Sequence, residues 1–191
     1  FATPPDGFFG AFKKELDARG ILLISDEVQT GWGRTGEHFW GYQAHNTVPD
    51  MLTFAKGVGN GAALAGVVAR AEIMDTIEVT SFSTFGGNPL SAAAGNATLQ
   101  ALEDEDMQAN ALARGRQLTA GLEAAVAANE WMAELRGKGL MQAIEFVHDG
   151  SNEADAGTAG AFLERCRANG LLVGKGGLYG NVIRIAPMLN V

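Results

Sequence analysis

The 191-residue sequence predicts an α/β fold, and three observations support this prediction. Short apolar runs alternate with longer segments of helical periodicity, a pattern typical of helices packed on a mostly parallel sheet. Hydrophobic residues make up 47% of the chain and charged residues 19%, enough apolar material for a sizeable core. The 26 glycines lie mostly in short loops beside the apolar runs, where a backbone can come close to a ligand.

The first half of the chain predicts one helix and three strands. Apolar side chains recur at helical spacing in residues 6–20, and Gly20 is placed as the C-cap. The continuous apolar run 21–25 then predicts a strand buried on both faces, as in a parallel sheet. After a loop rich in Gly and Trp, the apolar runs 51–56 and 65–72 predict two more strands.

The second half predicts helices first and then a small α+β region. Asn88 as N-cap and Pro89 at the first helical position predict the start of an Ala-rich helix. Further on, the patterns predict helices at 105–129 and 153–169, a strand at 139–147, and two short strands with a tight Gly turn within 170–187. This change of texture predicts two domains, residues 1–100 and residues 101–191.

The charge and the cysteine content narrow the function classes. A formal net charge of -8 and a pI of about 4.8 argue against nucleic acid or an anionic membrane as the main partner. The single cysteine, Cys166, allows neither an intrachain disulfide nor a cysteine-based metal cluster, and it favours a reducing, cytoplasmic setting. The three histidines lack ligand spacing, so we expect no metal site, and no apolar window is long enough for a membrane span.

Two residues at predicted strand ends could carry chemistry. Asp26 follows the run 21–25 and Lys56 ends the run 51–56, and ligands of α/β sheets bind beyond the carboxyl ends of strands. Taken singly, Asp26 could be a helix cap and Lys56 a solvated strand end. Together they are an anion and an amine of the types that pyridoxal phosphate requires: a lysine that forms a Schiff base and an acid beside the pyridine nitrogen.

Four segments resemble motifs of one enzyme family. They are "ISDEVQTGWGRTGEHFWGYQAH", "PDMLTFAKGVGNG", "STFGGNPLSAAA" and "GLLVGKGGLYGNVIRIAP", in order along nearly the whole chain. They resemble the class III pyridoxal-phosphate aminotransferases, most closely the alanine–glyoxylate and β-amino acid–pyruvate branch. The resemblance implies a fold-type I enzyme, of which this chain is the C-terminal part of the large, mostly parallel-sheet domain plus a truncated small α+β domain.

The resemblance also implies roles for residues around the cofactor ring. Asp26 would pair with the pyridine nitrogen, Val28 would pack on one ring face, and Gln29 would lie near the phenolic oxygen. Lys56 would hold the cofactor as a Schiff base and then move the proton during transfer. Without the resemblance, Val28 is simply a core residue and Gln29 an ordinary loop residue.

Two further roles follow from the same resemblance. Thr84 would bind the phosphate of the cofactor in a partner subunit, which implies a homodimer. Arg184 would hold the substrate carboxylate with both guanidinium nitrogens. Without the resemblance, Thr84 could be an ordinary loop cap, and Arg184 could simply form an ion pair with a surface carboxylate. Met188 stands where the family usually has a second proline after this arginine.

The implied activity is transfer of an amino group from an amino acid or amine to a 2-oxo acid such as pyruvate or glyoxylate. A decarboxylase or aminomutase of the same class, and a catalytically incomplete dimerisation fragment, remain alternatives. A dinucleotide-binding module is disfavoured because the glycines after Lys56 alternate instead of following G-x-G-x-x-G. The family's upstream phosphate loop and ring-stacking aromatic are not found, so we expect the 191 residues alone to bind the cofactor weakly and to be inactive.

Overall fold

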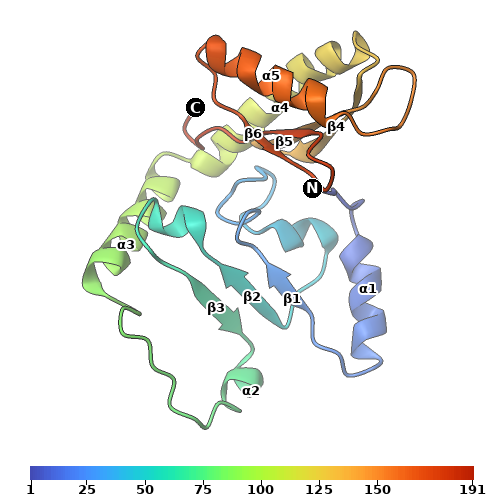
Figure 1. The fold of residues 1–191 in the computed structure, drawn as a ribbon. Coiled ribbons are helices and arrows are strands. Elements are labelled where there is room, and N and C mark those ends of the chain that lie inside the picture. The colour runs from blue at the N-terminus through green and yellow to red at the C-terminus, as the bar shows by residue number, and fades with distance from the viewer. The chain divides into compact units, whose positions relative to one another are not determined.

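The computed structural model describes residues 1–191, which form two compact units. The first unit comprises Pro4–Gly33 and Glu37–Gln108, and the second comprises Phe1–Thr3, Arg34–Gly36 and Ala109–Val191. Both units are drawn in Figure 1. The assignment of a large domain to residues 1–100 and a small domain to residues 101–191 stays a prediction.

The first unit is built on a three-stranded sheet in the order β1-β2-β3. Strand β1 (Ile24–Asp26) runs parallel to β2 (Met51–Phe54), and β3 (Gly66–Ala69) is antiparallel to β2. Three α-helices belong to the same part of the chain: α1 (Phe8–Asp17), α2 (Ala71–Met74) and α3 (Pro89–Asp104). A long segment without regular structure connects α2 to α3 (Figure 1).

The predicted strand at 21–25 is only partly right. Strand β1 starts later, at Ile24, and it is not buried on both faces, since Ile24 is 54% exposed. The physical reason is that β1 pairs with β2 alone and no helix packs closely over it within this chain, so the side chain of Ile24 stays open. The runs 51–56 and 65–72 also contain shorter strands than predicted, and the pairing of β2 with β3 is antiparallel. The one-turn helix α2 was not predicted.

The predicted helix-end signals are present, although α1 ends at Asp17 and its C-cap position is Ala18 instead of Gly20. After α1 the chain turns through Gly20 at φ +65°, and the N–H of Ile21 donates to the carbonyl of Leu16, so Gly20 ends the turn that closes the helix. At α3 the Oδ1 atom of Asn88 accepts the N–H of Ser91 at 2.9 Å, with Pro89 in the first helical position.

A buried carboxylate fixes the start of this sheet. Asp50 is 4% exposed and accepts the N–H of Leu23 at 2.7 Å. It also pairs with Lys13 of α1 at 3.3 Å and with Arg70, which follows β3, at 3.1 Å. The hydrogen bond from Leu23 lowers the pKa of Asp50 against the opposing effect of burial, and the two cations lower it further. One side chain therefore connects α1 to the starts of β1 and β2 and to the end of β3.

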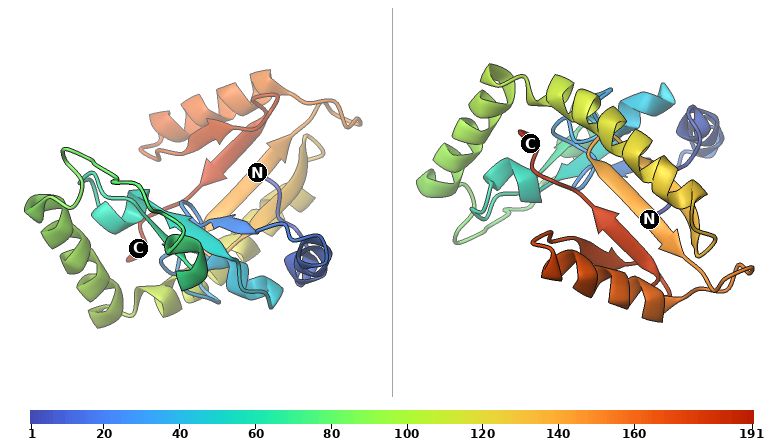
Figure 2. Two further views of the ribbon diagram at one scale, coloured as in Figure 1. Left: turned by 90° about the horizontal axis from the view of Figure 1, so that it is seen from below. Right: turned by 90° about the horizontal axis from the view of Figure 1, so that it is seen from above.

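The second unit is an antiparallel sheet in the order β4-β5-β7-β6, with two helices on one face (Figures 1 and 2). The elements are α4 (Met107–Ala127), β4 (Met132–Lys138), β5 (Met141–Phe146), α5 (Ala156–Ala168), β6 (Gly174–Gly176) and β7 (Val182–Ile185). Side chains of the strands and of α5 form the core between them, including Ile144, Phe146, Ala159 and Ile183.

Strand β4 was not predicted, because its sequence MAELRGK carries charges at alternate positions. The alternation separates two faces: Leu135 packs against the core, while Glu134 and Arg136 share the opposite face. The turn that follows is tight. A Cβ on Gly139, at φ +52°, would lie 2.5 Å from the Thr35 backbone, so only glycine fits there.

Candidate active site

Asp26 and Lys56 lie at the carboxyl ends of the neighbouring parallel strands β1 and β2. Asp26 is the last residue of β1 and stands opposite Thr53 in the parallel register. Lys56 follows three residues after Thr53, just beyond the end of β2, and both charged side chains are exposed. The two predicted residues thus lie at the carboxyl-terminal end of the sheet. This is the end at which α/β proteins bind ligands.

The backbone at Lys56 has an uncommon conformation. Lys56 has φ +50°, in the left-handed region, and begins the short 3₁₀ helix η2 (Lys56–Gly59). A non-glycine residue at such φ carries backbone strain, which is concentrated at functional sites. Among the glycines that follow, Gly59 is closely packed: an added Cβ would lie 3.3 Å from Leu64. The other two are not crowded, because an added Cβ would make an ordinary 3.7 Å contact at Gly57 and would have no atom within 4 Å at Gly61.

The carboxylate of Asp26 is held through one of its two oxygens. Its Oδ1 atom accepts the backbone N–H of Val28 and the hydroxyl of Thr53, each at 3.2 Å. No residue of the chain bonds to Oδ2. Val28 is half-buried and Gln29 is exposed, both directly after Asp26 in the loop that leaves β1.

The next residue, Glu27, was missed as a structural centre of this loop. It is 1% exposed, and its carboxylate accepts the hydroxyls of Ser25 (2.9 Å) and Thr30 (2.6 Å). It also accepts the backbone N–H groups of Gly41 and Tyr42, each at 2.8 Å. The Asp-Glu pair in the sequence was a signal for this, because successive side chains at a strand end point to opposite faces. Glu27 thereby fixes the loop that carries the candidate ring-binding residues.

An aromatic cluster packs beside the same loop. Trp32, itself at φ +64°, meets Phe54 of β2 at 5.3 Å between ring centroids in an edge-to-face arrangement. Trp32 also meets Trp40 at 4.7 Å and Phe39 at 5.7 Å. A Cβ on Gly57 would lie 3.7 Å from the indole of Trp32, so the cluster reaches the residue next to Lys56. These contacts join the loop after β1 to the end of β2.

Thr84 belongs to the first unit but lies away from regular structure. It sits in a turn of the segment between α2 and α3 and is exposed. Its aromatic neighbours are equally open, Phe82 being 85% and Phe85 81% exposed. Within this chain, the structure does not bring Thr84 into contact with Asp26 or Lys56.

Arg184 lies on β7 in the second unit. The strand register aligns Gly174, Arg184, Ala143 and Arg136 in one row across the sheet, on the face opposite the helices. Arg184 is half-buried, and its guanidinium carbon lies 6.0 Å from the centroid of the Phe1 ring. The row thus contains two arginines, of which only Arg184 was predicted as a functional residue.

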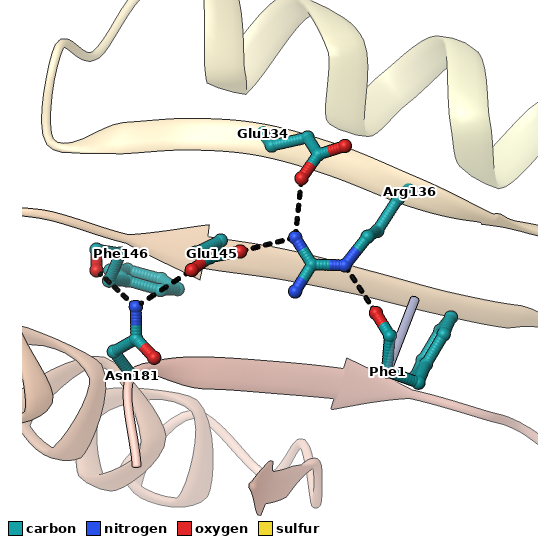
Figure 3. Close-up of polar contacts among 6 residues, drawn as sticks. All are labelled: Phe1, Glu134, Arg136, Glu145, Phe146 and Asn181. Carbon is teal, nitrogen blue, oxygen red and sulfur yellow. Dashed lines mark hydrogen bonds and ion pairs between the residues drawn. The ribbon is translucent and has the colours of Figure 1, made fainter. Parts of the chain in front are cut away.

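The other arginine, Arg136, is neutralised by two carboxylates. Its guanidinium pairs with Glu134 and Glu145 and donates to the Phe1 carbonyl, as Figure 3 shows. Glu145 also accepts from Asn181 at 3.2 Å. Burial would raise the pKa of Glu145, but the hydrogen bonds from Arg136 and Asn181 outweigh it and lower the pKa. Arg136 is therefore a structural cation with no remaining charge to offer a substrate anion.

Arg34 is also structural. Its guanidinium donates to the carbonyls of Leu140 and Pro187, and burial lowers its pKa. No group of three or more His, Cys, Asp or Glu side chains is arranged to hold a metal ion. None of the helices has the length and apolarity that a membrane crossing requires.

Comparison with known proteins decides the family. The model of the family "Aminotransferase class-III" matches residues 1–191. The chain belongs to the class-III aminotransferase family. This agrees with the four sequence motifs and with the position of Asp26 and Lys56 at adjacent strand ends.

Relatives of this class-III chain have more than one activity. It is 39% identical to human mitochondrial alanine–glyoxylate aminotransferase 2, covering 97% of this chain and 37% of that protein. It is 41% identical to the alanine/serine racemase of Pyrococcus horikoshii, covering 98% of this chain and 39% of that protein. The chain thus spans about two fifths of the length of these curated relatives.

Solved structures give the same fold for this class-III chain. An Arthrobacter phospholyase in complex with phosphoethanolamine superposes with a TM-score of 0.93 at 36% identity, over 98% of this chain and 45% of the other. A Bacillus anthracis aminotransferase superposes with a TM-score of 0.91 at 29% identity, over 99% and 45%. The predicted fold-type I class is confirmed.

Proposed function

We propose that the protein containing this chain is a pyridoxal-phosphate-dependent aminotransferase. It would transfer an amino group from an amino acid or amine to a 2-oxo acid such as pyruvate or glyoxylate. The observation that carries the proposal is the placement of Asp26 and Lys56 at the carboxyl ends of two adjacent parallel strands in a class-III chain. The similarity to alanine–glyoxylate aminotransferase 2 supports these acceptors.

The residues present fit pyridoxal phosphate. Asp26 is an exposed carboxylate with one oxygen unbonded, and Lys56, just beyond the end of the neighbouring strand, carries an exposed amine. When bound, the cofactor supplies an electron sink that stabilises negative charge at the substrate's Cα. Lys56 would hold it covalently and move a proton at Cα, and Asp26 would keep the pyridine nitrogen protonated. Val28 and Gln29 would contact the ring, and Arg184 would bind the substrate carboxylate.

The decisive experiment uses the full-length protein with an amine-donor panel, each donor paired with pyruvate or glyoxylate. We expect Lys56→Ala to abolish amino transfer and Lys14→Ala, an exposed lysine in α1, to retain it. Retention of transfer in Lys56→Ala would overturn the assignment. Omitting the 2-oxo acid separates this function from racemisation or elimination, activities named for two relatives, because those reactions need no amino acceptor.

We further propose that the protein is a homodimer in which Thr84 serves the cofactor phosphate of the partner subunit. The exposure of Phe82 and Phe85 on either side of Thr84 supports this, because apolar side chains of that size are usually covered. Light scattering should give twice the chain mass for the full-length protein. Phe82→Asp should shift it toward the monomer, and a Phe82→Asp protein that remains fully dimeric would contradict the proposal.

Two expectations concern the isolated chain and its compartment. We propose that the 191 residues alone are inactive, since the phosphate loop of the family is not among them. Pyridoxal phosphate titrated into this chain should bind far more weakly than to the full-length protein.

We also propose a cytoplasmic location, supported by the single Cys166. The human relative is named as mitochondrial, so cell fractionation is the test.

A further inference from the structure

The candidate ring anchor Asp26 is asymmetric. Both of its hydrogen bonds, from the N–H of Val28 and from the hydroxyl of Thr53, converge on Oδ1 at 3.2 Å. Its other oxygen, Oδ2, has no partner in the chain. A free, exposed carboxylate turns about its last side-chain torsion, whereas two donors on one oxygen select one orientation.

Thr53 is placed to do this by the strand register. It stands directly opposite Asp26 in the parallel pair β1–β2, so the two side chains emerge on the same face of the sheet. Paired residues on neighbouring strands are about 4.8 Å apart along the hydrogen-bonding direction, within reach of a hydroxyl. Thr53 also lies three residues before Lys56, which follows just beyond the end of the same strand.

We propose that Thr53 is a positioning residue for Asp26. Its hydroxyl holds Oδ1, so that Oδ2 is presented to the N–H of the pyridine ring in the orientation that an N–H···O bond requires. The inference rests on the proposed function, because it assumes that Asp26 pairs with that nitrogen. The Val28 N–H lies only two residues after Asp26 in the chain, whereas the Thr53 hydroxyl ties the carboxylate to the neighbouring strand, which leads to Lys56.

The test compares the hydroxyl with the rest of the side chain in the full-length protein. Thr53→Val keeps the β-branched shape that suits a strand and removes the hydroxyl, while Thr53→Ser keeps the hydroxyl. Thr76→Val is the matched control, since its hydroxyl bonds the Ile73 carbonyl away from the strand ends. The cofactor is removed, and the apo-proteins are titrated with pyridoxal phosphate while tryptophan fluorescence is followed.

For Thr53→Val we expect a dissociation constant for pyridoxal phosphate about fivefold higher than wild type, the factor that one hydrogen bond of ordinary net strength gives. We expect kcat to fall by a similar factor with the KM of the amine donor unchanged. Thr53→Ser should restore both values to within about twofold, and Thr76→Val should match wild type. Wild-type values in Thr53→Val, or equal losses in the Val and Ser variants, would overturn the role of the hydroxyl.

Asp26→Asn separates this inference from the proposed function. If Asp26→Asn loses cofactor affinity and activity while Thr53→Val loses neither, the ring anchor stands and the role of Thr53 fails. If Asp26→Asn behaves as wild type, the anchor itself is wrong, and the inference fails with it. If the inference is right, adding Thr53→Val to Asp26→Asn should cause no further loss, because the two groups act through one contact.

Discussion

Removing the buried carboxylate of Glu27 should loosen the loop that leads from Asp26 to the aromatic cluster. Each of its oxygens accepts one hydroxyl and one backbone N–H: Ser25 and Tyr42 on Oε1, Thr30 and Gly41 on Oε2. In Glu27→Ala the hydroxyls can turn to other acceptors, but the two N–H groups cannot. Because an orphaned donor costs about 1–3 kcal/mol, we expect a loss of about 3 kcal/mol in the free energy of unfolding.

Glu27→Gln should cost less, for a reason visible in the same contacts. The amide keeps one acceptor oxygen, and its NH₂ group can donate to a hydroxyl but not to a backbone N–H. One N–H group is therefore lost, and we expect about 1.5 kcal/mol. If Glu27→Gln loses more free energy of unfolding than Glu27→Ala, the contacts assigned to the Glu27 carboxylate are wrong.

Two measurements on the cofactor-free full-length protein check the Glu27 prediction. Urea titration gives the free energy of unfolding, with Glu123→Ala, an exposed glutamate on α4, as the control. Hydrogen exchange at the amides of Gly41 and Tyr42 reports opening of the loop itself. If Glu27→Ala matches the control within about 0.5 kcal/mol and both amides stay protected, the carboxylate does not hold the loop.

Three other perturbations have defined outcomes. The pKa of Asp50 is lowered below its ordinary 3.8, so the carboxylate stabilises the fold fully above that pH and ceases to do so as the pH falls below it. In Asp50→Asn, the free energy of unfolding from urea titration should therefore depend less on pH at and below pH 4 than it does in wild type. Arg136→Met should leave Glu145 without its cation and cost about 2 kcal/mol, less than for a fully buried pair, seen as a lower melting temperature; no shift would contradict it. Gly139→Ala should lower the free energy of unfolding in urea by about 3 kcal/mol. Gly150 also has a positive φ but faces open space, so Gly150→Ala should lower it by only about 1 kcal/mol. Equal losses in the two variants would show that crowding at Gly139 is unimportant.

Much of the first unit was predictable because its signals are local. The caps at Asn88 and Gly20 involve residues a few positions apart, and apolar runs mark β1 and β2 within two or three residues. Asp26 and Lys56 could be found because parallel strands place their carboxyl ends at one edge, a rule that needs no side-chain detail. The family resemblance added roles that the residue pattern alone left open.

What the sequence could not predict depends on pairing between distant segments. Strand β4 was missed because Glu134 and Arg136 make it look polar, although both charges belong to a face where Glu145 completes the ion pairs. The exposure of β1 could not be foreseen either, since an apolar run does not tell which elements pack over the faces of a strand. Such features require the register of the sheet, which a single sequence does not contain.

The Asp26–Glu27 dipeptide shows how register separates two similar side chains. By type, either carboxylate could be the ring anchor. The end of β1 turns Asp26 to the exposed face opposite Thr53, where two bonds leave one oxygen free, and turns Glu27 inward, where four donors occupy both oxygens. A carboxylate with all its acceptor sites filled cannot take a further N–H without giving one up, so the inward residue is suited to structure and the outward one to a ligand.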